Sequence, residues 1–379
     1  MTLRAENICK SYDGKVVLEN LSLQVEAGSF CALLGASGSG KTTLLRILAG
    51  IEKPDSGRVY YDDQDVTEVS VQERSIAFVY QQFVNYPSMT LYENIASPLR
   101  VSKNRFLDSE IREKVNKVAG LLGLQEVLHH LPEQASGGQR QRCAIARALV
   151  KEAQFIFMDA PLSNLDYKLR EELRTELKQI LGGRQRSEEG VSGDGHPRLK
   201  GVVVYATPEP IDVLMMASHV GFLHDRKVLQ FGEVQEVYQH PAHAAVASYF
   251  SHPRMNLIEC TVESQGGRSV LKVTDELKIE VGLGRDRLPD SRYLLGIRPH
   301  HLGLRRVHDR MIPFKAGVEL AEVVGSNTEL HLKHGNVRMT LFMDRVEQFA
   351  VGDIVTPCID PAQLYLFDLT TGEFVTRTG

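Results

Sequence analysis

Cysteine is scarce in this chain, and its few copies are scattered. The five cysteines, Cys9, Cys31, Cys143, Cys260 and Cys358, include no pair at the C-x-x-C spacing. This distribution indicates neither a zinc site nor a disulfide framework. We expect small buried thiols in a reducing cytosol.

Long apolar runs are also missing. The first six residues form no apolar signal core, and no later run approaches the roughly 18 apolar residues that span a bilayer. We therefore expect the chain to meet a membrane only through a partner.

The third absence is a strong bias in charge. The 379 residues include 44 Lys and Arg against 48 Asp and Glu, which gives a formal net charge of -4. A nucleic-acid binder shows a basic footprint, and this balance predicts no nucleic-acid partner. The length exceeds one ordinary domain and favours two.

What the chain does have is a phosphate-binding motif of the form G-x-x-x-x-G-K-[ST], at residues 35–42. In such a loop, backbone N–H groups converge on phosphate oxygens and the next helix points its positive end at them. The lysine adds a point charge and the hydroxyl is placed to ligate Mg²⁺. The residues predicted to bind the nucleotide here are Gly35, Ser37, Gly38, Ser39, Gly40, Lys41, Thr42 and Thr43.

The surroundings of the motif agree with this interpretation. Residues 30–34 are apolar and predict a buried strand before the loop, and residues 43–49 predict a helix after it. Helical spacing dominates from about 90 to 150, including 109–122, and apolar strands return at 155–159 and 202–205. The pattern predicts an α/β core with a helical insertion.

Two later segments differ from this core. Residues 182–201 are rich in Gly, Ser, Glu and Arg and predict a solvated surface loop. Beyond about residue 250, apolar and polar residues alternate between Gly-containing turns, which predicts a small antiparallel β domain. The alternating apolar residues are Leu277, Ile279 and Val281, then Leu330 and Leu332, then Val337, Met339 and Leu341.

Joined to the phosphate loop, the stretches 135–142 (ASGGQRQR) and 159–166 (DAPLSNLD) resemble the ATPase subunits of ABC transporters. The subgroup is that of importers for sugars and polyols, because 296–302 and 360–368 resemble its C-terminal OB-like regulatory domain. The resemblance implies an α/β fold with a RecA-like P-loop core in residues 1–245, a helical subdomain at about 88–150, and a β-rich regulatory domain in 250–379.

The resemblance also implies roles and cofactors. ATP and Mg²⁺ are the expected ligands, with Tyr12 stacking on adenine and with Thr42, Gln81 and Asp159 around the metal. The turn formed by Ser136, Gly137, Gly138 and Gln139 opens a helix toward the γ-phosphate bound by a second subunit. Asp166 helps the two subunits register.

Three residues depart from the family pattern. Ala135 replaces a leucine, a packing change from which we expect little. Ala160 stands where the family carries the glutamate that polarises water, and Pro208 where it carries a histidine that contacts the γ-phosphate. Loss of a general base costs about 10²–10⁴-fold in rate. Proline offers neither a side-chain donor nor an N–H.

Two explanations of Ala160 remain open: a laboratory substitution that traps ATP, or a naturally degenerate site. The coincident change at Pro208 favours the second. A degenerate half-site predicts a heterodimer with a competent ATPase subunit at the cytoplasmic face of the plasma membrane. Two permease subunits would dock near Gln81, at residues 83–88, and a solute-binding protein would act with them.

The transported solute lies outside what this chain specifies. The segments 78–87 and 205–210 resemble the paired ATPases of bacterial glycerol-uptake importers, and sugars, sugar alcohols and glycerol 3-phosphate stay open. Alternatives are a fully active homodimeric importer ATPase, a soluble ABC protein of translation or DNA repair, and an oligonucleotide-binding OB fold. Ala160 and Pro208 oppose the first, and the lack of basic and aromatic interleaving opposes the last.

Overall fold

A computed structural model describes residues 1–379 except 103–104, 182–200, 266–267, 285–286, 290 and 379. The loop predicted at 182–201 therefore lies almost wholly outside the described residues. The chain divides into two compact units, Met1–Gln235 and Glu236–Gly379.

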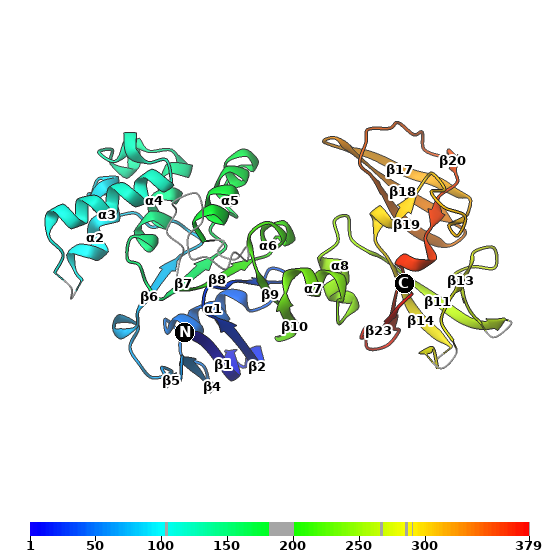
Figure 1. The fold of residues 1–379 in the computed structure, drawn as a ribbon, viewed down its shortest axis with the longest axis horizontal. Helices are drawn as coiled ribbons and strands as arrows, with labels where there is room; N and C mark the ends of the chain where they lie inside the picture. The colour runs from blue at the N-terminus through cyan, green and yellow to red at the C-terminus, as the bar shows by residue number, and fades with distance from the viewer. Residues whose placement is uncertain (103–104, 182–200, 266–267, 285–286, 290, 379) are drawn as a thin grey trace, which may run out of the picture. The chain divides into compact units, whose positions relative to one another are not determined.

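A parallel sheet forms the centre of the first unit (Figure 1). Its strand order is β10-β9-β3-β8-β7-β6, and every neighbouring pair runs parallel except β9 with β10. The strands are β3 (Phe30–Leu34), β6 (Ile76–Val79), β7 (Phe155–Asp159), β8 (Val202–Thr207), β9 (His219–His224) and β10 (Lys227–Glu233). Strands β3, β7 and β8 are buried along their whole length, as continuous apolar runs predict for a parallel sheet covered on both faces.

Two apolar cores lie on opposite faces of this sheet. Phe155 and Phe157 of β7 pack with α1 (Lys41–Ala49), whereas Ile156 and Met158 pack with the helical insertion. The side with α1 also carries an antiparallel sheet of order β2-β1-β4-β5. Its strands are β1 (Thr2–Tyr12), β2 (Lys15–Glu26), β4 (Ser56–Tyr61) and β5 (Gln64–Asp65).

The helical insertion has the helices that the sequence predicts. The predicted helix at 109–122 is α3, at Asp108–Leu121, and its buried residues include Ile111 and Val115. The other helices of the unit are α2 (Leu91–Arg100), α4 (Gly137–Leu149), α5 (Tyr167–Leu181) and α6 (Pro210–Met216), and α7 (Val234–Gln239) crosses the boundary between the units.

The second unit is mainly β structure, as predicted. Alternation places Ile279, Leu330, Leu332 and Leu341 in its apolar core. Its sheets have the orders β13-β12-β11-β14-β22-β23, β15-β21-β16 and β19-β18-β17-β20. The elements are α8 (Ala244–Tyr249), β11 (Asn256–Gln265), β12 (Arg268–Lys272), β13 (Lys278–Val281), β14 (Arg292–Ile297), β15 (Leu302–Gly303), β16 (Ile312–Pro313), β17 (Ala316–Val324), β18 (Asn327–His334), β19 (Val337–Met343), β20 (Ile354–Val355), β21 (Cys358–Ile359), β22 (Tyr365–Asp368) and β23 (Phe374–Arg377).

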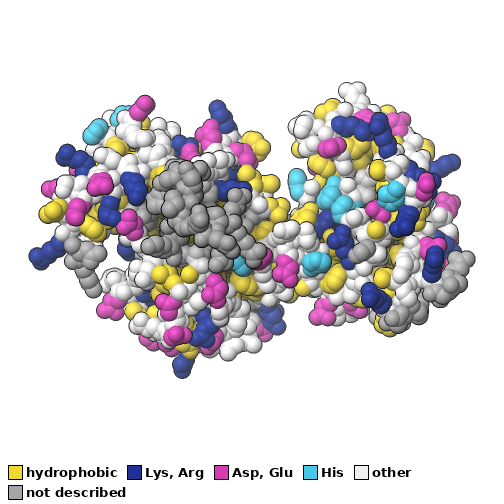
Figure 2. All heavy atoms as spheres, in the orientation of Figure 1, with side chains coloured by type: hydrophobic (Ala, Val, Ile, Leu, Met, Phe, Trp, Pro, Cys, Tyr) yellow, Lys and Arg dark blue, Asp and Glu magenta, His cyan; other side chains and the backbone are white. Residues whose placement is uncertain are grey.

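The distribution of charged side chains and the burial of the cysteines agree with what the composition predicts. Acidic and basic side chains are interspersed over the face of each unit that Figure 2 shows. All five cysteines are free; four are buried and Cys9 of β1 is half-buried. Among the described residues, no helix is long and apolar enough to span a membrane.

Candidate nucleotide site

The phosphate loop connects β3 to α1, as predicted. Gly40 caps α1 with φ of 98°, in the left-handed region that favours glycine. A Cβ on Gly40 would come within 2.7 Å of the Leu18 side chain. Glycine therefore suits this position, and the first backbone N–H groups of α1 have no partner within the helix and can meet an anion.

Lys41 lies across the loop. Its ammonium donates to the carbonyl oxygens of Gly35 at 2.8 Å and Ala36 at 2.7 Å, and Ser39 Oγ lies 3.4 Å away. Burial lowers the pKa of Lys41, and the nearby Asp159 carboxylate opposes that shift. The lysine is therefore held next to the positions where phosphate oxygens can replace the carbonyls. Of the other predicted loop residues, Ser37 and Gly38 are exposed and Thr43 is half-buried.

Thr42 and Asp159 meet where the metal is predicted. Thr42 Oγ1 donates to Asp159 Oδ1 at 2.8 Å, although 117 residues separate them in the chain. Burial raises the pKa of Asp159, against the effects of the Thr42 hydrogen bond and of Arg46 and Lys41. A hydroxyl and a carboxylate are the oxygen donors that Mg²⁺ prefers, so this pair fits the predicted ion.

Gln81 follows β6 and is exposed. Its Nε2 donates to Ser163 Oγ at 3.4 Å, and Asn164 Nδ2 donates to the Gln81 carbonyl at 3.2 Å. The contacts tie Gln81 to the turn after Asp159 rather than to the Thr42–Asp159 pair. Sequence reasoning did not foresee the roles of Ser163 and Asn164, because a contact between two loops leaves no periodic signal.

The turn predicted at residues 136–139, which we call the signature turn, begins α4. Ser136 is its N-cap, accepting from Gln139 N at 3.2 Å, while Gln139 Oε1 accepts from Ser136 N at 2.9 Å. A Cβ on Gly138 would come within 2.2 Å of Leu169, whereas none would meet anything within 4 Å at Gly137. A hollow of about 400 Å³ lies beside this turn, lined also by Phe83, Asn164 and Asp166.

The phosphate loop and the signature turn are the two halves of the predicted site. In the described part of the chain, no hydrogen bond links the turn at 136–139 to the loop at 35–43.

The two positions that depart from the family pattern lie at one edge of the sheet. Ala160 N donates to Ala206 O at 2.8 Å, and the register pairs Asp159 with Ala206, two residues before Pro208. Ala160 has a φ of 42°, and Pro208 is half-buried. Both departures from the family pattern thus fall at the ends of adjacent parallel strands, where such sheets bind ligands.

Tyr12 ends β1 and its side chain is 42% exposed. Its hydroxyl donates to Glu52, and the Lys10 ammonium lies 5.4 Å from the ring centre. An exposed ring is compatible with base stacking, and the role of Tyr12 stays a prediction, as do the roles of the other site residues.

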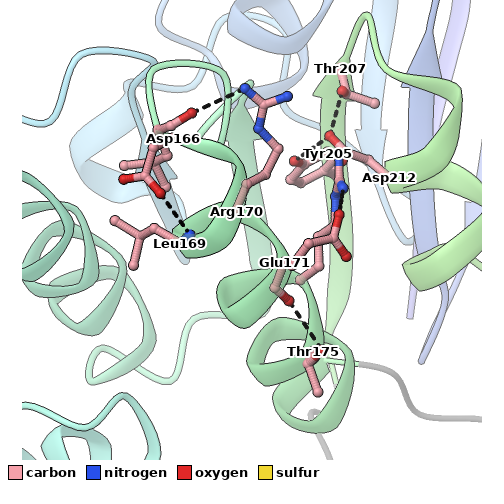
Figure 3. A network of polar contacts seen from close by, with 10 residues as sticks. Asp166, Leu169, Arg170, Glu171, Thr175, Tyr205, Thr207 and Asp212 are labelled. Atoms are coloured by element: carbon pink, nitrogen blue, oxygen red, sulfur yellow. Dashed lines mark hydrogen bonds and ion pairs between the residues drawn. The ribbon is translucent and has the colours of Figure 1, made fainter. Parts of the chain in front are cut away.

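A buried polar network next to this edge was missed by sequence reasoning. It joins Arg174 of α5 to Asp212 of α6 and to Tyr205 and Thr207 of β8 (Figure 3). No linear signal could have found it, because 38 residues separate Arg174 from Asp212.

Comparisons with known proteins place these features in a known context. A family profile described as ABC transporter matches residues 18–163, and one described as TOBE domain matches 295–367. The chain is 34% identical over 373 residues to the sn-glycerol-3-phosphate import ATP-binding protein UgpC of Yersinia enterocolitica, and the match covers 98% of each chain. It is also 34% identical over 387 residues to the trehalose/maltose import ATP-binding protein MalK of Thermococcus litoralis, covering 98% of this chain and 99% of the relative.

Solved structures agree with the α/β fold of the first unit. The dimeric structure of MJ0796, a bacterial ABC transporter cassette, is 30% identical with a TM-score of 0.52, covering 61% of this chain and 98% of the other. The same protein bound to ADP and Pi, in a post-hydrolysis state, matches equally well. The predicted α/β cassette followed by a β-rich domain is confirmed.

Proposed function

The chain belongs to the family of ABC-transporter ATP-binding proteins, which bind ATP with Mg²⁺, and from that premise we propose that it is an importer subunit whose own hydrolytic half-site is degenerate. It binds ATP at the 35–43 loop and acts in a heterodimer with a competent ATPase subunit. The turn at 136–139 completes the partner's active site. The solute is a small carbohydrate or polyol, with glycerol and glycerol 3-phosphate included.

One observation carries the proposal. The binding side is complete, with Lys41 and the Thr42–Asp159 pair in place, while Ala160 and Pro208 remove two side chains from adjacent strand ends. One loss alone is compatible with a trapped laboratory variant. Two losses at one edge favour a half-site that evolved to bind ATP without turning it over, and binding alone stabilises a closed dimer by mass action.

The placement at a membrane follows from the same family membership. The relatives are import ATP-binding proteins, so we propose that two permease subunits and a solute-binding protein work with this chain, which lies peripherally on the cytoplasmic face of the membrane. The segment 83–88 is the proposed permease contact. Val84 and Tyr86 are 57% and 47% exposed, and Asn85 Nδ2 donates to Arg140 O of α4 at 3.0 Å. A movement of the permease at this segment would therefore be transmitted through Asn85 to α4, the helix that begins at the signature turn.

The test is ATP binding and ATP turnover by the purified full chain with Mg²⁺. We expect tight binding with turnover near the level of a Lys41→Ala control, which removes the phosphate contact. The double variant Ala160→Glu with Pro208→His should raise turnover by about 10²-fold or more, because a positioned base contributes about 10²–10⁴-fold. The single variants apportion the gain.

Ordinary turnover by the unmodified chain would overturn the degenerate-site proposal. Glu209 is then the first alternative base to remove, because it directly follows Pro208 and is half-buried. In that case the fully active homodimer becomes the better description.

A further inference from the structure

The network around Asp212 is fully buried and fully paired. Asp212 Oδ1 accepts from Arg174 Nε at 2.6 Å, while Oδ2 accepts from Tyr205 Oη at 3.0 Å and from Thr207 Oγ1 at 2.8 Å. The exposed fraction of each of these four residues is 3% or less. Burial is the main cause that raises the pKa of Tyr205, and the Asp212 carboxylate adds to it.

One end of the network leads to the turn before α5. Asp166 Oδ1 accepts from Leu169 N at 3.0 Å, and Arg170 Nη2 donates to Leu165 O at 3.1 Å. Figure 3 shows Asp166, Leu169 and Arg170 together at the start of α5. Arg174 lies one turn further along the helix and pairs with Asp212. The position of the 165–166 turn is therefore coupled to that of Arg174 by a short, hydrogen-bonded length of helix.

The other end leads to the strand edge at Pro208. Thr207 Oγ1 donates to Asp212 and also accepts from Glu209 N at 3.0 Å, so the backbone on both sides of Pro208 is anchored. Ala206, next along the strand, accepts from Ala160 N. One carboxylate thus connects the edge where the γ-phosphate is expected with the turn that the family places at the subunit interface.

Stability alone does not explain this arrangement. A buried ion pair is commonly no better than two well-packed apolar side chains, because desolvation offsets the attraction. The charged pair does fix the relative orientation of the two side chains, because charge-assisted hydrogen bonds are geometrically specific.

We propose that Asp212, held by Arg174, is a positioning residue that moves the 165–166 turn together with the 206–209 segment when nucleotide binds. The inference rests on the proposed function, in which this chain reports bound ATP to its partner rather than hydrolysing it. Occupancy of the phosphate loop then alters the surface that Asp166 presents to the partner subunit.

The experiment uses a single fluorescent reporter in the full chain. The sequence has no tryptophan, and Tyr167, the first residue of α5, is 76% exposed, so Tyr167→Trp reports on this turn alone. We expect ATP with Mg²⁺ to shift its emission. Replacing the pair by Arg174→Met with Asp212→Leu should reduce that shift on the order of fivefold, while the affinity for a fluorescent ATP analogue changes by less than about threefold.

A control removes a different, more exposed ion pair. Lys114→Met with Glu152→Leu breaks an ion pair of 2.6 Å between α3 and the segment after α4, and should leave the shift intact. The thermal midpoint is measured for each variant. If the Arg174/Asp212 double variant does not fold, Asp212→Asn decides, since it keeps the size of the side chain and removes the charge.

The outcomes separate the two proposals. ATP affinity retained with the shift lost supports a positioning role, because a purely structural defect would lower the midpoint and the affinity together. A full shift in a folded Asp212 variant, or no shift in the Tyr167→Trp chain that binds ATP, overturns the inference alone. Absence of ATP binding by the unmodified chain overturns the proposed function instead.

Discussion

The phosphate loop and the edge formed by β7 and β8 lie in one unit and have diverged differently. The loop keeps every residue type that holds phosphate: Lys41 contacts the loop carbonyls, and Thr42 contacts Asp159. At the edge, Ala160 N donates a hydrogen bond to Ala206 O. Residue 160 is an alanine rather than an acid, and residue 208 is a proline rather than a histidine. The comparison teaches that the phosphate contacts and the two departures from the family pattern are carried by different residues of one unit, and our proposal assigns these residues to ATP binding and to turnover respectively.

The largest effect should follow from removing the binding side. Lys41→Ala deletes a buried ammonium that contacts the loop, and charge-assisted bonds to phosphate are worth about 1.5–3 kcal/mol each. We expect ATP affinity to fall by at least about 10²-fold, measured by titration with a fluorescent ATP analogue. Lys53→Ala is the control, since the Lys53 side chain is 69% exposed. An equal loss of ATP affinity in both variants would show that Lys41 contributes no more to binding than an exposed surface lysine.

The next effect concerns the signature turn. Gly138→Ala forces a Cβ against Leu169 at 2.2 Å, and overpacking costs about 1–3 kcal/mol. Gly137→Ala meets nothing within 4 Å and should not lower the free energy of unfolding, because alanine favours a helix more than glycine does. Denaturant unfolding of both variants measures the difference. Equal destabilisation would show that Leu169 yields easily.

A smaller effect comes from the ionisation of Asp159. Because burial raises the pKa of Asp159, its protonated form accumulates at a higher pH than an ordinary aspartate allows. Mg²⁺ requires the carboxylate, so the Mg²⁺-dependent part of ATP affinity should weaken, on the order of tenfold or less, as pH falls through that raised value.

The variant Asp159→Asn separates this effect from the titration of ATP itself. The Mg²⁺-dependent decline should be absent in the variant when affinities are measured across the same pH series. An identical decline in both proteins would assign it to the nucleotide.

The smallest effect tests whether the N-cap of α4 stabilises its helix as much as another N-cap in the same unit does. Ser136 and Thr90 each form a capping box, on α4 and α2 respectively. We expect Ser136→Ala and Thr90→Ala to lower the free energy of unfolding by a similar amount, about 1 kcal/mol each. Only the Ser136 variant should impair a partner's turnover in the mixed dimer. Impairment by both would mean that helix stability, rather than the signature hydroxyl, is responsible.

Much of the architecture could be predicted because its signals are local. The strands at 30–34 and 155–159 were predicted with the bounds observed for β3 and β7, and the alternation at 330–341 gave the core positions of β18 and β19. Periodicity reports which face of an element is buried, and that information lies within a few neighbouring residues.

By itself, the sequence determined the ligand class, the family and the two departures from the family pattern at Ala160 and Pro208, because motifs with fixed spacing encode backbone geometry and residue chemistry directly. The tertiary structure alone decided which distant groups meet. It paired Thr42 with Asp159, turned Gln81 toward Ser163, and buried Asp212 against Arg174 and Thr207. Such contacts depend on how strands order and helices pack across the sheet, and a hydrogen bond between residues 38 or 117 positions apart has no counterpart in local sequence.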